Sequence, residues 1–157
     1  MNRRELEEIL LENCVPPHTF SFDVVKYDGD TFCLIQTGKI WKILYTERNI
    51  LVPVKEFDTE QEACEFLYQD FKKRYGFIEN AWSEISSFNS YGQCASLEKH
   101  LQKELLAGTA KEIPVFTTEL LPADFVQEER WFEQLKTHKI WRLARPENPF
   151  WGFWKTL

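Results

Sequence analysis

The chain has 157 residues, of which 43% are hydrophobic, 28% charged and 15% aromatic, so it is long enough to bury a sizeable core without a metal or disulfide. Nineteen basic and twenty-five acidic residues give a formal net charge of −6, which disfavours nucleic acid and anionic membranes as partners and suits a basic protein. No apolar run is long enough to span a membrane, and the acidic start is unlike a signal peptide, so we expect one cytoplasmic domain over residues 1–157.

The first predicted element is a helix that begins after Asn2, because Asn2 and Glu5 have the spacing of a capping box and an apolar stripe follows. Pro16 and Pro17 end this helix. Residues 20–27 then predict a strand, and we expect the turn at residues 28–30 to join it to the next strand in a hairpin.

Residues 31–76 carry the clearest pattern in the chain. Three runs rich in β-branched and aromatic residues, at 32–36, 40–45 and 50–54, are separated by short turn-like segments and predict an antiparallel meander. Pro53 has no amide hydrogen for a ladder, so the third strand lies at an edge or ends early.

A helix follows the meander. Thr59 and Glu62 form a second capping box, with the Thr59 hydroxyl accepting from the Glu62 amide and the Glu62 side chain reaching back to the Thr59 amide, and Gly76 ends the helix. Its broad apolar face must pack on the neighbouring sheet. We therefore predict an α+β fold in which an antiparallel sheet of about four or more strands packs against helices.

The signals are weaker after Gly76. In chain order they predict a loop at 83–92, a helix at 96–106, a short extended piece at 113–116, a helix at 124–136 and a strand at 139–144. Four of the six tryptophans lie between residues 131 and 154. This aromatic end either closes the core, which we favour, or is an exposed anchor for a partner.

The segment at residues 37–43 is similar to that at residues 137–143. This local match indicates either duplicated strands or coincidence. Coincidence gains support because a strand precedes the first copy, whereas the predicted helix precedes the second.

Motifs for phosphate binding, zinc proteolysis, serine hydrolysis and protein kinases are absent from the sequence. The four cysteines are 19, 31 and 30 residues apart and have no zinc-type partner, so we expect buried free thiols and neither metal nor cofactor. One nucleophile arrangement is worth naming, in which Cys94 is paired with His100 or His138 and oriented by Asp124. A small thiol hydrolase therefore stays as an alternative.

Residues 56–70 contain six acidic side chains and no basic one. Acidic residues are favourable at the N-terminus of a helix, but this explains only the first turn. The remainder indicates either an acidic surface patch or an ordinary solvated face. If the patch binds a partner, the residues we select are Asp58, Glu62, Glu65 and Asp70.

Two segments, CLIQTGKIWKILYTERN at residues 33–49 and VKEFDTEQEACEFLYQDFKKRYG at residues 54–76, resemble a group of small bacterial immunity proteins. Those proteins neutralise polymorphic or contact-dependent toxins. The matching residues are Cys33, Trp41, Tyr45, Glu47, Arg48, Phe57, Glu60, Ala63, Cys64 and Tyr68. Asn49 stands where the family usually has glycine, and both residues tolerate a positive φ.

The resemblance implies a non-enzymatic inhibitor, without catalytic residues, that binds a cognate toxin domain in the cytoplasm and occludes its active site. Many such toxins are basic nucleases, which agrees with the negative charge of this chain. The alternative is an adaptor or regulatory module that docks through the aromatic C-terminus.

Overall fold

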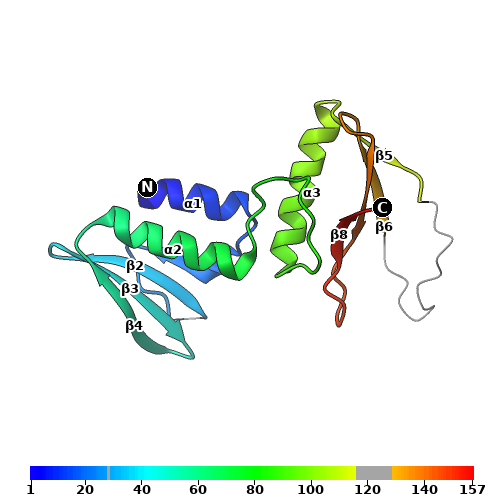
Figure 1. Cartoon of the computed structure of the whole chain (residues 1–157). Coiled ribbons are helices and arrows are strands. Elements are labelled where there is room, and N and C mark those ends of the chain that lie inside the picture. Colours follow the sequence, from blue (N-terminus) through cyan, green and yellow to red (C-terminus); the bar gives the residue numbers. More distant parts are fainter. Residues whose placement is uncertain (28, 116–128) are drawn as a thin grey trace. The chain divides into compact units, whose positions relative to one another are not determined.

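The computed structural model describes residues 1–27, 29–115 and 129–157 (Figure 1). These residues form three α-helices, one 3₁₀-helix and eight strands. In chain order the elements are α1 (Arg3–Glu12), η1 (Pro17–Thr19), β1 (Phe20–Phe22), β2 (Thr31–Thr37), β3 (Ile40–Glu47), β4 (Ile50–Phe57), α2 (Glu60–Tyr75), α3 (Tyr91–Leu106), β5 (Ala110–Ile113), β6 (Glu129–Gln134), β7 (Lys139–Ala144) and β8 (Phe153–Thr156).

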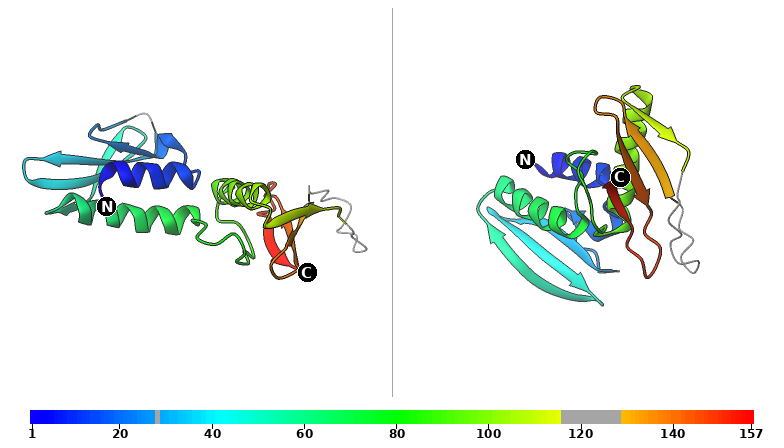
Figure 2. Two further views of the ribbon diagram at one scale, coloured as in Figure 1. Left: turned by 90° about the horizontal axis from the view of Figure 1, so that it is seen from above. Right: turned by 45° about the vertical axis from the view of Figure 1, so that its right-hand side comes forward.

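The described residues divide into two compact units, Met1–Tyr75 and Gly76–Leu157, where the sequence predicts one domain. Each unit has a four-stranded sheet of its own, in the order β1-β2-β3-β4 and β5-β6-β7-β8. In the first unit α1 and α2 lie on the same face of the sheet, and in the second α3 covers one face (Figures 1 and 2). The predicted α+β class, with mostly antiparallel strands packed against helices, is confirmed.

The predicted meander of the first unit is confirmed, since β2 pairs with β3 and β3 with β4, both antiparallel. Arg48 and Asn49 form the two-residue turn before β4, with φ of 49° and 65°. Two positive φ angles match the right-handed twist of the flanking strands, so asparagine does replace the usual glycine here. β4 lies at the sheet edge, as Pro53 predicts, and continues beyond it to Phe57.

The predicted hairpin between residues 20–27 and the next strand is wrong. β1 covers only Phe20–Phe22 and runs parallel to β2. Asp23, at a φ of 66°, turns the chain away, and the Ser21 hydroxyl donates to the Val24 carbonyl at 2.8 Å. Two parallel strands need a connection that returns the chain to the end where the first strand began. In this connection the Gly29 carbonyl accepts a hydrogen bond from Thr46 Oγ1 of β3 at 3.0 Å.

The predicted capping box at Asn2 and Glu5 is present, whereas only half of the one predicted at Thr59 and Glu62 is formed. The Asn2 side chain accepts from the Glu5 amide, and the Glu5 carboxylate accepts from the Asn2 amide. At the second helix the Thr59 hydroxyl accepts from the Glu62 amide at 3.2 Å, but the Glu62 carboxylate accepts from the Thr59 hydroxyl rather than from its amide.

In the second unit, α3 begins at Tyr91 rather than at residue 96, because Ser90 accepts a hydrogen bond from the Gln93 amide and caps the helix inside the predicted loop. The predicted helix at 124–136 is wrong from residue 129 onward, where β6 pairs with β5 and β7. Residues 124–128 and Phe116, the last residue of the predicted extended piece, lie outside the described residues.

The aromatic C-terminus mainly fills the core of the second unit. Trp154 is fully buried, stacks on Trp141 with ring centroids 5.0 Å apart, and donates through Nε1 to the Ala81 carbonyl at 2.6 Å. Trp131 is also buried, whereas Trp151 is half exposed. The core interpretation therefore describes three of the four C-terminal tryptophans.

The two similar segments occupy equivalent places. Each leads from a hairpin turn into the middle strand of a meander, and Trp41 and Trp141 are both buried. A strand precedes both copies, because β6 replaces the predicted helix. The two copies therefore no longer differ in the element that precedes them, which was the reason to regard their similarity as coincidence.

Candidate functional site

Half of the six acids at residues 56–70 are neutralised by bases from elsewhere in the first unit. The ion pairs join Glu56 to Lys42 at 2.7 Å, Glu60 to Arg3 at 2.8 Å and Asp70 to Arg74 at 2.5 Å. Burial raises the pKa of Glu60, but the hydrogen bonds from the backbone and side chain of Arg3 outweigh this effect, so the pKa lies below its ordinary value. The charges of these three acids are therefore offset within the unit.

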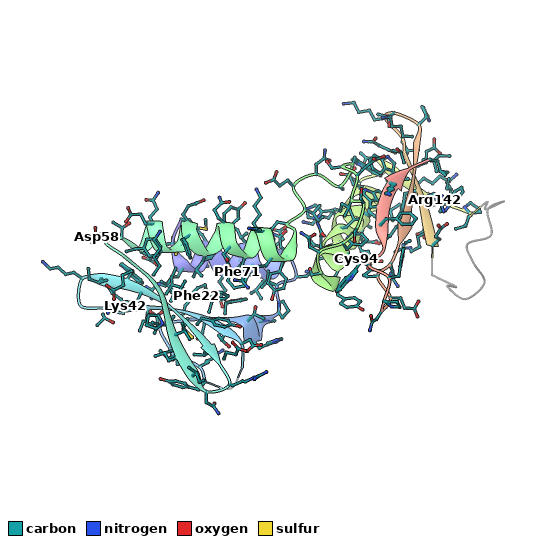
Figure 3. The ribbon with its side chains drawn as sticks, turned by 60° about the horizontal axis from the view of Figure 1, so that its bottom comes forward. Phe22, Lys42, Asp58, Phe71, Cys94 and Arg142 are labelled. Atoms are coloured by element: carbon teal, nitrogen blue, oxygen red, sulfur yellow. The ribbon has the colours of Figure 1, made fainter. Side chains whose placement is uncertain are left out.

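The other three acids, Asp58, Glu62 and Glu65, are exposed and form no ion pair in the described parts of the chain. Glu62 accepts only from the neutral Thr59 hydroxyl, and Glu65 accepts from Gln69 Nε2 at 2.8 Å. Neither donor is a cation, so neither bond is an ion pair. Asp58 lies at the corner where β4 leads into α2 (Figure 3).

The four acids predicted to bind a partner differ in their ion pairing, because three of them have no ion pair in the described residues and Asp70 has one. Asp70 is half-buried and neutralised by Arg74. At about 100° per residue it also lies about 140° around the helix from Glu65. The structure keeps Asp58, Glu62 and Glu65 as candidates and places Asp70 apart from them.

Two of the family-motif residues, Trp41 and Tyr45, support the core beneath the helices. The Arg3 guanidinium lies over the Trp41 ring, 4.7 Å from its centroid, and Tyr45 contacts Phe32 with centroids 4.9 Å apart. Two further motif residues, Glu47 and Arg48, are exposed at the tip of the β3–β4 hairpin. The motif thus shapes this hairpin and its packing.

Tyr45 also lines a cavity of about 450 Å³ in the first unit. Its walls are largely aromatic, with Phe32, Phe71 and Tyr75 beside Arg74. Burial and the negative charge of Asp30 raise the pKa of the Tyr45 hydroxyl. The sequence did not indicate this cavity, because its walls come from two strands, α2, η1 and the segment between β1 and β2.

The most unusual surface of the first unit is β4, which the sequence analysis did not single out as a site. Its large apolar side chains are exposed: Ile50 to 63%, Leu51 to 39%, Val52 to 45% and Val54 to 41%. One signal was present, since Pro53 placed this apolar run at a sheet edge, where only one side of the strand is covered.

The structure does not assemble the thiol-hydrolase arrangement from its described members. Cys94 is buried, and desolvation raises its pKa to about 12, which suppresses the nucleophilic thiolate at neutral pH. The rings of His100 and His138 bond elsewhere, to the Ser96 carbonyl at 2.9 Å and to Glu133 at 2.8 Å. Asp124 lies outside the described residues. All four cysteines are free, as predicted, and Cys14 is only half-buried.

Within residues 1–27, 29–115 and 129–157, no group of three or more histidine, cysteine or acidic side chains is placed to hold a metal ion. No helix in these ranges has both the length and the apolar character needed to cross a membrane. No protein-family model, curated protein or solved structure matches the chain.

Proposed function

We propose that this chain is a non-enzymatic immunity protein that binds a cognate bacterial toxin domain in the cytoplasm and neutralises it by covering its active site. The resemblance of residues 31–76 supplies the class of protein. The observation that carries the proposal is the set of exposed, unpaired carboxylates on Asp58, Glu62 and Glu65 at the start of α2.

Three uncompensated negative charges within eight residues give this corner of the first unit a negative potential. A nuclease toxin has a basic surface where its phosphate substrate binds. Charges of opposite sign accelerate association and select the partner more than they add affinity. The carboxylates would occupy positions on the toxin that the substrate phosphates otherwise take.

Co-purification with the product of the adjacent gene tests the proposal. We expect Glu62→Lys with Glu65→Lys to slow association at least tenfold and to reduce protection of the cell. The matched control is Glu7→Lys with Glu147→Lys, which makes the same charge change at two exposed acids outside this surface. Equal binding by wild type and the Glu62/Glu65 variant would reject this surface while leaving the function open.

A second candidate function, an adaptor that docks through its aromatic end, has one supporting observation. Trp151 is 50% exposed and packs against the exposed ring of Tyr91, with centroids 5.9 Å apart. Deleting residues 150–157 cannot test it cleanly, since that removes the buried Trp154. Trp151→Ala is the suitable variant, because it should keep the fold and would abolish binding only if this side chain is the anchor.

A further inference from the structure

We infer that β4 is the apolar centre of the partner-binding interface and that Asp58, Glu62 and Glu65 form its charged border. The inference rests on the proposed function and specifies the partner, a folded protein that presents an apolar strip next to basic side chains.

Exposed aliphatic side chains occur along β4 on both faces of the sheet. Ile50 and Val52 pair with Glu47 and Tyr45, so they are on the same side as the helices. Leu51 points to the opposite side, because successive side chains of a strand alternate. Exposed aliphatic side chains along a sheet edge are typical of a protein-binding strand, since monomeric proteins avoid large exposed apolar patches and unprotected edges.

The backbone of β4 opposes the addition of another strand. Antiparallel pairs alternate between hydrogen-bonded and non-hydrogen-bonded, starting from the Glu47 and Ile50 pair at the turn, so the Pro53 nitrogen faces away from β3. That nitrogen has no hydrogen to donate. A bulge between Ile43 and Leu44 further disturbs the register. A partner therefore binds the side chains of β4 rather than extending the sheet.

The charges beside β4 indicate the kind of partner. Asp58 follows the strand directly and lies four residues beyond Val54, about 13 Å along the strand. Near the same end, Lys55 lies over the rings of Phe57 and Phe66, 5.1 Å from each centroid. Past Lys55 and Glu56, β4 therefore leads to Asp58, and Glu62 and Glu65 follow in the first turns of α2. A second copy of the chain would present the same acids, so charge complementarity favours a basic partner.

The test measures binding of the toxin domain encoded beside this gene to the full chain carrying Val52→Thr and Val54→Thr. Threonine keeps the shape and strand preference of valine, adds no charge and removes apolar area. The matched control is Val24→Thr with Val115→Thr, at two other exposed valines. We expect the β4 variant to bind 10- to 100-fold more weakly through faster dissociation, with an unchanged salt dependence. The control should stay within about threefold of wild type.

Binding of the β4 variant within threefold of wild type would overturn the inference and leave the proposed function standing. Failure of the wild type to bind the toxin domain would overturn both. A wild-type dimer that the β4 variant dissociates would identify a second copy as the occupant and reject the basic partner. A fall of several degrees in the melting temperature of the isolated variant would show that other parts of the chain cover β4. That result would also reject the basic partner as the occupant of β4.

Discussion

Glu60 and Glu62 lie two residues apart in α2, yet the structure gives them different roles. The Glu60 carboxylate accepts from the backbone and side chain of Arg3 at 3.0 and 2.8 Å, which fastens α1 to α2. The Glu62 carboxylate accepts from the Thr59 hydroxyl at the helix start, and the Glu62 amide donates to the same hydroxyl. At the scale of single residues, the partner of each carboxylate decides whether its charge is available for binding.

Glu60→Gln should lower the free energy of unfolding at pH 7 by about 1–2 kcal/mol, because it weakens a charge-assisted hydrogen bond. The pKa of Glu60 is lower in the folded state than in the unfolded state. Its carboxylate therefore contributes to the free energy of unfolding above the unfolded pKa near 4.5, and this contribution is lost as the pH falls through the folded pKa. Urea unfolding at pH 7 and pH 3 measures both effects. The control Glu56→Gln, at a more exposed ion pair, should cost less than about 0.5 kcal/mol, and equal costs would contradict the assigned role.

The thiols supply a second prediction for single residues. Burial raises the pKa values of Cys64 and Cys94 to about 11 and about 12. Iodoacetamide at pH 8 should therefore modify the half-buried Cys14 first and leave Cys94 intact until the protein unfolds. Peptide mass spectrometry with and without urea gives the order. Rapid modification of native Cys94 would restore the hydrolase alternative.

Among the larger elements, the β8 segment depends on the backbone at Gly152, which has a φ of 67°. A Cβ at this position would clash with the backbone of Ala144, Arg145 and Pro146, whereas a Cβ at Gly108, with a similar φ of 68°, would meet open space. Gly108→Ala should cost about 1 kcal/mol for backbone strain alone. Gly152→Ala should cost at least about 2 kcal/mol more, because the crowding adds to the strain.

Chemical denaturation monitored by tryptophan fluorescence compares these two variants. Trp141 and Trp154 are buried and stacked, so loss of β8 would change the signal directly. Equal destabilisation by the two variants would show that the C-terminal segment is not packed as described.

The elements that the sequence predicted well are those with local signals at their ends. Asn2 and Thr59 place the starts of α1 and α2, and Pro53 places β4 at an edge. Residues 129–136 were assigned to a helix because Trp131, Phe132 and Leu135 fit a helical stripe. In the structure Trp131 pairs with Ile113 and Arg142 on neighbouring strands, and that nonlocal pairing overrides the local spacing.

The candidate surface could be predicted only in part from the sequence, because it too depends on residues that are distant along the chain. The acidic run itself was visible, but its ion pairs depend on Arg3, Lys42 and Arg74. Arg3 lies 57 positions from Glu60, and no sequence pattern links them. The exposure of Val52 and Val54 likewise depends on the sheet order, in which β4 is paired on one side only, with β3, among the described strands.

At the scale of the whole molecule, two compact units each build a sheet around a similar hairpin. We expect residues 1–76 alone to unfold cooperatively in urea, because the first unit has its own core around Phe71, Phe32 and Phe20. Circular dichroism at several urea concentrations measures this. A fragment without a cooperative transition would show that its fold requires the rest of the chain.

We expect this protein to neutralise a basic toxin domain through a surface of the first unit. The most direct measurement is a calorimetric titration of the full chain with the toxin domain encoded beside its gene, combined with an assay of toxin activity on the same mixtures. We expect nanomolar or tighter binding, and toxin activity that disappears as the titration saturates. The absence of binding at about 10 μM, which corresponds to a binding free energy no more favourable than about −7 kcal/mol, together with a fully active toxin would contradict the proposed function.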